Sequence, residues 1–425
     1  MTGRKELRLN SVCYDICIIG AGASGLVAAI ESSRRGLSCV VVEKNKKPAV
    51  KLYATGNGRC NLTNDTWEED SYYENSFVDS VYDALYRDTG LRPRNFVIDY
   101  FKKLGVTTVN KNGYIYPRSM QASTVVWSLV DAAKANGAEI RCPFKVENVI
   151  CNTDQDGIFY EILGVSGKNS KAEDSTIYAR KLILATGGIS QPELGAAEES
   201  NLYNLINSLG LTAKEFKSGL CPVYCSDDLS ALAGVRTKAV VSVNGHSEKG
   251  EVQFTEKGLS GIVIFNMSYY LNPGDTIHLS LLDISEDDFV HHFNLVKSKY
   301  PGRSLIAFLN GYINDKLALY YKNAFYGSEL KLCLVDVTEA GIRGLYQDMN
   351  DWWIKIRSKA DISSSQASIG GIITDDINPG TMCIKYKRFN ETLYAVGEVT
   401  DVIGKCGGYN LTYAFVTGYL AGRNI

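Results

Sequence analysis

The sequence has no apolar run that approaches the ~20 residues a membrane-spanning helix requires, so we expect no membrane partner. It is also poor in histidine. The four residues at 246, 278, 291 and 292 have no metal-ligand spacing, and no metal site is predicted. An excess of charge is missing as well, because 45 basic side chains stand against 47 acidic ones, which leaves a net charge of −2. That balance argues against a nucleic-acid partner, since such proteins concentrate positive charge.

Two further patterns are absent. Gly258-Leu-Ser-Gly261 has the wrong spacing for the G-x-S-x-G turn that carries a nucleophilic serine. The eleven cysteines form an odd number and are scattered without a regular framework, although Cys221 and Cys225 are spaced C-x-x-x-C, so no disulfide framework is predicted. We therefore expect reduced thiols and a cytoplasmic location.

A nucleotide-binding pattern stands near the start of the chain. An apolar strand at 14–19 leads into Gly20-Ala-Gly22-Ala-Ser-Gly25, a helix over 26–35 and a second strand at 38–42 that ends on Glu43. In this G-x-G-x-x-G unit the glycines permit a tight turn, close approach to a pyrophosphate and close helix packing. An acidic residue at the end of the second strand binds ribose hydroxyls and disfavours a 2′-phosphate, so the ligand is FAD or NAD. The contacts predicted from this unit are Gly20, Gly22, Ala23, Ser24, Gly25, Glu43 and Lys44.

Several motifs farther along the chain narrow the choice of cofactor. The most specific are Gly58-Arg-Cys-Asn-Leu-Thr-Asn64, and Gly397-Glu-Val-Thr-Asp-Val-Ile-Gly404 with Gly407-Gly-Tyr-Asn410. With them the chain resembles the BaiN/YhiN-like flavoproteins, relatives of aminoacetone oxidase that are described as NAD(P)/FAD-dependent oxidoreductases. The resemblance spans nearly the whole chain and implies FAD bound between its two ends.

The resemblance also implies where FAD is held. Gly397 and Glu398 are expected at the pyrophosphate and ribitol. Residues 407–411, at the start of a last helix that can run over 411–421, are expected at the flavin ring. The turn Ala185-Thr-Gly187 follows a late apolar strand and belongs to the same expected site. The further predicted cofactor contacts are Gly58, Arg59, Cys60, Asn61, Val146, Ala185, Thr186, Gly187, Gly397, Glu398, Gly408, Tyr409, Asn410 and Leu411.

No catalytic residue is assigned from the sequence. Cys60, Tyr409 and Tyr413 are weak candidates, because they stand in the segments expected at the flavin. Packing under the flavin or lining of a pocket is the commoner role of such residues.

The domain pattern is that of a split α/β protein. A length of 425 residues fits about three domains. We predict a Rossmann-like FAD-binding domain in two segments, 1–190 and 361–425, interrupted by a β-rich, barrel-like domain at 191–283. A helical insertion follows at 284–349, and a strand at 350–360 returns to the β-rich domain.

The predicted function is that of an FAD-dependent oxidoreductase acting on a small organic molecule. No second G-x-G-x-x-G is present, so NADH or NADPH would serve only as a transient electron donor, and use of O₂ is equally compatible. The resemblance suggests reduction of an enone of bile-acid or steroid type, with oxidation of an amine as the alternative. A protein that acts on tRNA and a flavin-binding protein without turnover are the alternatives of other classes. The chain departs from the family pattern at Glu256, at Ile262 and over 195–201, and these departures leave the identity of the substrate open. The oligomeric state is open as well.

Overall fold

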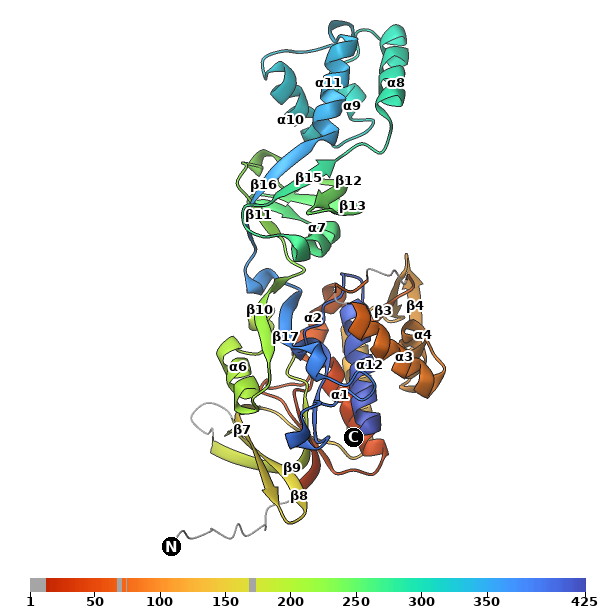
Figure 1. Ribbon diagram of the computed structural model, residues 1–425. Helices are drawn as coiled ribbons and strands as arrows, with labels where there is room; N and C mark the ends of the chain where they lie inside the picture. Colours follow the sequence, from red (N-terminus) through yellow and green to blue (C-terminus); the bar gives the residue numbers. More distant parts are fainter. Residues whose placement is uncertain (1–12, 67–70, 74, 168–172) are drawn as a thin grey trace. The chain divides into compact units, whose positions relative to one another are not determined.

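A computed structural model of the chain describes residues 13–66, 71–73, 75–167 and 173–425 (Figure 1). The chain forms two compact units, one from residues 1–217 and 367–425 and the other from residues 218–366. Among the helices that the structure describes, none combines the length and apolar character needed to cross a membrane.

The first unit is built on a seven-stranded sheet. Strands β1 (Cys13–Ile19), β2 (Cys39–Val42) and β6 (Glu139–Arg141) are parallel, and β1 also pairs in parallel with β9 (Glu173–Leu184). Strand β18 (Leu393–Ala395) joins the end of β9 in parallel, while β7 (Phe144–Asp154) and β8 (Gly157–Ser166) continue the sheet as antiparallel neighbours. Strands β1 and β2 are buried along most of their length, as is typical of a sheet covered on both faces.

Two helices from opposite parts of the chain pack together on this sheet. Helix α1 (Ala23–Arg34) and helix α12 (Tyr409–Asn424) are both buried over most of their residues. A Cβ atom added at Gly418 would lie 2.3 Å from the Ser24 carbonyl oxygen, and one at Gly422 would lie 2.6 Å from the Ala28 oxygen. The two backbones therefore approach as closely as glycine permits.

Smaller elements complete the first unit. A three-stranded sheet combines β3 (Thr63–Asn64), β5 (Tyr114–Pro117) and β4 (Thr108–Lys111). The other helices are α2 (Val50–Gly58), α3 (Asn75–Thr89), α4 (Pro93–Lys103), α5 (Ala122–Ala135) and α6 (Glu199–Ser208). Strand β10 (Ala213–Gly219) pairs with β17 (Ala367–Ile372).

The first unit extends to residue 217, whereas the sequence pattern placed the end of this segment at 190. The difference arises from α6, a helix in a region expected to be β-like. Its apolar residues Leu202, Leu205 and Ile206 follow helical spacing and are buried.

The second unit contains a closed barrel in the order β11–β14–β13–β12–β15–β16. The strands are β11 (Val223–Cys225), β12 (Arg236–Val243), β13 (His246–Thr255), β14 (Gly258–Ser260), β15 (Thr276–Ser280) and β16 (Trp352–Lys359). The late strand β16 closes the barrel by pairing with both β15 and β11. The expected Rossmann-type α/β fold with an inserted barrel and helices is thus confirmed.

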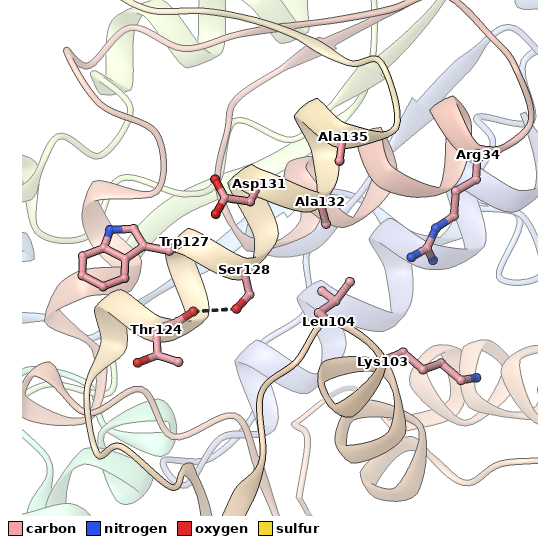
Figure 2. A pocket seen from close by; sticks show the side chains of 9 residues that line it. All are labelled: Arg34, Lys103, Leu104, Thr124, Trp127, Ser128, Asp131, Ala132 and Ala135. Atoms are coloured by element: carbon pink, nitrogen blue, oxygen red, sulfur yellow. Dashed lines mark hydrogen bonds between the residues drawn. The ribbon is translucent and has the colours of Figure 1, made fainter.

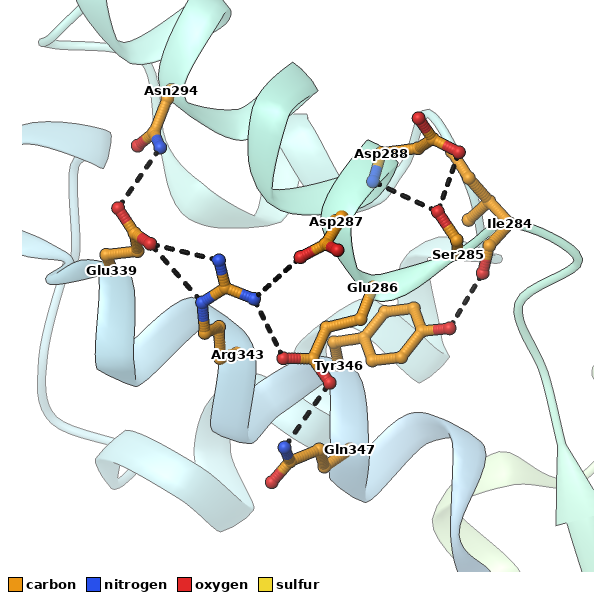
Figure 3. A network of polar contacts seen from close by, with 10 residues as sticks. All are labelled: Ile284, Ser285, Glu286, Asp287, Asp288, Asn294, Glu339, Arg343, Tyr346 and Gln347. Carbon is orange, nitrogen blue, oxygen red and sulfur yellow. Dashed lines mark hydrogen bonds and ion pairs between the residues drawn. The ribbon is translucent and has the colours of Figure 1, made fainter.

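Helices α7 (Ile262–Met267), α8 (Glu286–Lys299), α9 (Leu305–Leu309), α10 (Asp315–Tyr326) and α11 (Glu339–Asn350) complete the second unit. Ser285 caps α8 by accepting a hydrogen bond from the Asp288 amide. The Arg343 guanidinium on α11 reaches Glu286 at 3.0 Å on α8 and Glu339 at 3.1 Å on its own helix (Figure 3). The pair with Glu286 links α11 to the start of α8, whereas the pair with Glu339 lies within α11.

Candidate functional site

The turn between β1 and α1 has the backbone that its glycines allow. Gly20 has a φ of +108°, and a Cβ atom there would lie 2.2 Å from the Ala185 carbonyl oxygen. A Cβ atom at Gly25 would lie 2.0 Å from the Gly20 oxygen. Both positions exclude larger residues because backbone already fills the space.

Gly22 is different, because a Cβ atom there would meet nothing within 4 Å. Gly22 is also the N-cap of α1, and no side chain caps the helix. The first turn, with Ala23 and Ser24, therefore presents amide groups and a partial positive charge to an open space. Such a helix end suits a phosphate group.

The end of β2 contributes a carboxylate beside this space. Glu43 is buried, and its Oε2 atom accepts a hydrogen bond from the Ala21 amide at 3.0 Å. Its Oε1 atom accepts bonds from the Asn45 amide at 2.8 Å and from Asn45 Nδ2 at 2.7 Å. The carboxylate is thus fixed at the mouth of the glycine turn, with its orientation set by neighbouring amides.

The neighbours of Glu43 point in other directions. The Lys44 ammonium donates to the Ala196 carbonyl, and burial lowers the pKa of Lys44. Val146 is buried in β7, the strand whose first residue, Phe144, donates its amide to the Glu43 carbonyl oxygen at 2.7 Å. Val146 therefore lies near the ribose end of the predicted site, while Lys44 turns away to another loop.

A buried polar cluster surrounds Glu398, which lies in a 3₁₀ turn directly after β18. Its Oε2 atom forms an ion pair with Lys51 Nζ of helix α2 at 2.8 Å. Its Oε1 atom accepts bonds from Ser190 Oγ at 3.1 Å and from the Ser368 amide at 2.9 Å. Sequence reasoning missed Lys51, Ser190 and Ser368, since nothing in the local pattern links these three segments.

The cluster decides the charge of Glu398. Burial by itself would raise the pKa of this carboxyl. The Lys51 ammonium opposes burial, together with the hydrogen bonds from Ser368 and Ser190, and holds the pKa below its ordinary value. Glu398 is therefore an anion at neutral pH, although its surroundings are largely dry.

The turn that follows α2 contains an unsatisfied polar atom. Gly58 and Arg59 are exposed, whereas Cys60 and Asn61 are buried. Burial raises the pKa of the Cys60 thiol to about 12, so this sulfur is a neutral packing group. The Asn61 Oδ1 atom is buried with no hydrogen-bond partner among the described residues. A buried oxygen without a donor indicates a missing partner.

Helix α12 begins on Gly408, which has a φ of +100° and lies against Thr63. No side chain caps this helix either. The Asn410 side chain pairs twice with Gly404, accepting from its amide at 2.9 Å and donating to its oxygen at 2.8 Å. These bonds fix the loop before the helix, and Leu411 follows in the first turn.

The two candidate tyrosines already have partners. The Tyr409 hydroxyl donates to the Thr66 carbonyl oxygen at 3.0 Å, and the Tyr413 hydroxyl lies 2.9 Å from Thr400 Oγ1. Both tyrosines are buried, and burial raises the pKa of Tyr413. Their hydroxyls hold the loop and helix in place, and a role in proton transfer stays a prediction.

The remaining predicted residues lie between the two halves of the site. The Ala185 amide donates to the Ile19 oxygen at 2.9 Å, which places the turn of Thr186 and Gly187 beside the glycine turn. A Cβ atom at Gly187 would lie 4.0 Å from Glu398 Oε2, and one at Gly397 would lie 2.6 Å from Ser24 Oγ. The structure thus brings the start of α1 together with the segment before α12.

These residues fit a flavin dinucleotide. The open space before α1 suits the pyrophosphate, the Glu43 carboxylate suits ribose hydroxyls, and the orphaned Asn61 oxygen suits an N–H donor. The uncapped end of α12 adds a second positive helix end.

A separate groove of about 490 Å³ lies on the outer side of the first unit (Figure 2). Helix α5 contributes most of its lining, including Trp127 and Asp131, and Arg34 and Lys103 stand at its edge. None of the predicted cofactor residues lines it. It therefore does not belong to the candidate site.

Comparison with known proteins agrees with this geometry. The family model described as "HI0933-like protein Rossmann domain" matches residues 14–424, and the chain belongs to this family. The 3-dehydro-bile acid Δ(4,6)-reductase of Clostridium scindens is 31% identical over 96% of this chain and 98% of its own. Ribosomal RNA dihydrouridine synthase of Escherichia coli is 27% identical over 97% of this chain and 98% of its own. The Haemophilus influenzae protein of that name is 26% identical over 96% and 97%.

The family is the one that the sequence motifs resemble, and that prediction is confirmed. The chain is of the FAD-dependent oxidoreductase class, with a flavin as its cofactor.

Proposed function

We propose that the protein is an NAD(P)H-dependent flavoenzyme that reduces a C=C bond conjugated to a carbonyl group in a small, steroid-like enone. The buried Asn61 oxygen without a donor carries the cofactor part of the proposal, because it lies in the Gly58–Asn64 motif, whose Thr63 lies against Gly408 at the uncapped start of α12. The reaction class is supported by the bile-acid reductase, which is similar over nearly its full length.

In this proposal each part of the site has one task. The amides of the first turn of α1, which follow Gly22, bind the pyrophosphate, and Glu43 binds the ribose. Glu398, held anionic by Lys51, binds hydroxyl groups of the ribitol chain. Asn61 offers its amide oxygen to an N–H donor of the ring system. Bound FAD supplies hydride transfer at its N5 atom.

The chemistry of the substrate follows from what a hydride requires. A carbonyl conjugated to a C=C bond withdraws electrons from the β carbon, which then accepts hydride while the α carbon takes a proton. Tyr409 and Tyr413 are the candidates for the proton, since both stand in the first two turns of α12. The three alternatives of amine oxidation, tRNA modification and flavin binding without turnover lack a named relative of their own among the proteins described above.

A second candidate keeps the same bond chemistry and changes the substrate. Two relatives bear the name ribosomal RNA dihydrouridine synthase. The C5=C6 bond of uracil is conjugated to the C4 carbonyl, so its reduction is again a hydride addition to an activated double bond. We therefore propose uridine in ribosomal RNA as the alternative substrate, which reopens the prediction that no nucleic acid binds.

One spectroscopic experiment tests these proposals. The flavin absorbance band of the purified holoprotein is followed anaerobically after NADH, then NADPH, is added. We expect bleaching by one donor and recovery of the band on addition of a Δ4-3-ketosteroid. Recovery with uridine-containing ribosomal RNA alone would replace the first candidate by the second. If an amine bleaches the flavin band and neither NADH nor NADPH does, both proposed substrates are refuted.

A further inference from the structure

The outer surface of the barrel carries aromatic and basic side chains side by side. Strand β16 alternates, so that Ile354 and Ile356 are buried in the barrel while Trp353, Lys355 and Arg357 are exposed. The neighbouring strand β11 adds Tyr224, and the turn between β13 and β14 adds the exposed Lys257. We call this set the β16 face: Tyr224, Lys257, Trp353, Lys355 and Arg357.

Trp353 is exposed although neighbouring residues hold its ring in place. Its side chain is 58% exposed, although its indole N–H donates to Asp351 Oδ1 at 2.7 Å. The His278 ring on β15 lies 4.6 Å from it, measured between ring centroids. The ring is thus held in one position while more than half of its surface faces solvent. A ring held in this way offers a fixed aromatic surface on which a planar group can stack.

Two of the three cations of the β16 face lie over the second aromatic ring. Lys257 Nζ lies 5.8 Å from the centre of the Tyr224 ring, and Arg357 Cζ lies 5.9 Å from it. Within the described part of the chain, none of Lys257, Lys355 and Arg357 forms an ion pair with a carboxylate, and their charges remain available.

Acidic groups do border the face, and their positions are fixed. Asp351 holds the Trp353 indole and approaches His278 Nε2 at 3.2 Å. Asp227 accepts the backbone amide of Lys355 at 3.0 Å. Both carboxylates are hydrogen-bonded to β16 or its tryptophan, whereas Glu256 is exposed next to Lys257. The face therefore offers three cations to phosphates because none of the three is ion-paired among the described residues, not because acidic groups are missing.

We propose that the β16 face binds single-stranded RNA, with bases stacked on Trp353 and Tyr224 and phosphates held by Lys257, Lys355 and Arg357. Aromatic platforms interleaved with cations are the recognition mode for unpaired strands, because every base has a stacking surface and every nucleotide a charge. A duplex would offer its phosphates but bury its bases, and so leave the tryptophan unused. This surface binds RNA whichever substrate the flavin site reduces.

Fluorescence anisotropy of a labelled oligouridine RNA against the full-length holoprotein tests the proposal without any turnover. We expect binding that weakens as salt is raised. Trp353→Ala is expected to weaken it roughly 5- to 150-fold, the effect of losing one stacked base. The double variant Lys355→Ala/Arg357→Ala is expected to lower the slope of log affinity against log salt by about 1.4, since each phosphate contact on a single strand contributes about 0.7.

Matched variants elsewhere provide the controls. Trp127→Ala removes a tryptophan that is 60% exposed on the other unit, and Lys299→Ala/Lys331→Ala removes two exposed cations of the second unit. Both should leave RNA affinity unchanged. Trp353→Phe, which keeps a platform, should retain most of the binding even where Trp353→Ala lowers stability. Three results would overturn the assignment to RNA. The control variants could lose as much affinity as the β16-face variants, the binding could show no salt dependence, or oligothymidine DNA could bind with equal affinity. None of these results bears on the proposed reduction of a conjugated C=C bond, which the flavin spectrum tests separately.

Discussion

Replacement of Lys51 by methionine removes the only cation that the described structure places on the half-buried Glu398 carboxylate. The two atoms are 2.8 Å apart, and the side chains are 28% and 24% exposed. Breaking a fully buried pair costs about 3–5 kcal/mol, because the remaining charge stays in a dry environment. With about a quarter of each side chain in water, we expect Lys51→Met to reduce the free energy of unfolding by about 2 kcal/mol at pH 8.

The pH dependence gives this prediction its sign. In the native protein the Glu398 pKa is lowered, so its contribution is present above the unfolded value and is lost as the pH falls through the folded value. Without Lys51, burial dominates and the pKa of the carboxyl rises. The variant can then protonate Glu398 in the folded state, and the penalty relative to wild type should shrink from pH 8 to pH 5.

Urea unfolding of the apoprotein, followed by circular dichroism at both pH values, measures this effect without a contribution from cofactor binding. The double variant Lys51→Met/Glu398→Gln should be at least about 1 kcal/mol more stable than the sum of the single effects predicts. Lys103→Met, which breaks an exposed helical pair with Asp99, is the control and should cost about 0.5 kcal/mol or less. A loss of stability that is the same at both pH values, or strictly additive, would refute a buried ion pair.

Three further outcomes test other parts of the site. Gly22→Val should leave the apoprotein folded, because the Cβ position is open, and should abolish FAD binding. Gly25→Val should instead lower the melting temperature, because a backbone oxygen lies 2.0 Å from the added Cβ atom. Cofactor absorbance and thermal melts distinguish the two effects. Asn61→Leu should not destabilise the apoprotein, since Oδ1 has no partner to lose, but should weaken FAD binding roughly 5- to 10-fold in a titration, the effect of one hydrogen bond; unchanged affinity would contradict the assignment. At pH 8 a thiol with a pKa of about 12 is ionised in about one molecule in ten thousand. A disulfide reagent should therefore modify the exposed Cys151 and spare Cys60 until denaturant is added. Rapid labelling of Cys60 in the Cys151→Ser variant would contradict the burial of this thiol.

The parts of the fold that the sequence predicts are those with local causes. The β1–α1–β2 unit follows from glycine spacing and a short apolar run, both of which stand in adjacent residues. The barrel strand β16 could be assigned to the β-rich part, because its apolar residues alternate.

The Glu398 cluster could not be predicted in the same way. Lys51, Ser190 and Ser368 lie on three segments that meet only after β9, β17 and β18 have taken their places. Long-range pairing decides their distances, and polar residues at such positions have no periodic signature. The orphaned state of Asn61 is likewise a property of packing, although its motif pointed to the residue.

The close crossing of α1 and α12 has a consequence for biosynthesis. Gly418 and Gly422 seat the last helix on Ser24 and Ala28, and Gly397 lies against Ser24. During translation, the amides at the start of α1 emerge long before these partners, with the whole barrel and its helices synthesised in between. The part of the predicted cofactor site that α12 supplies is therefore made after all the rest, and we expect flavin that needs both segments to bind only once α12 has been synthesised.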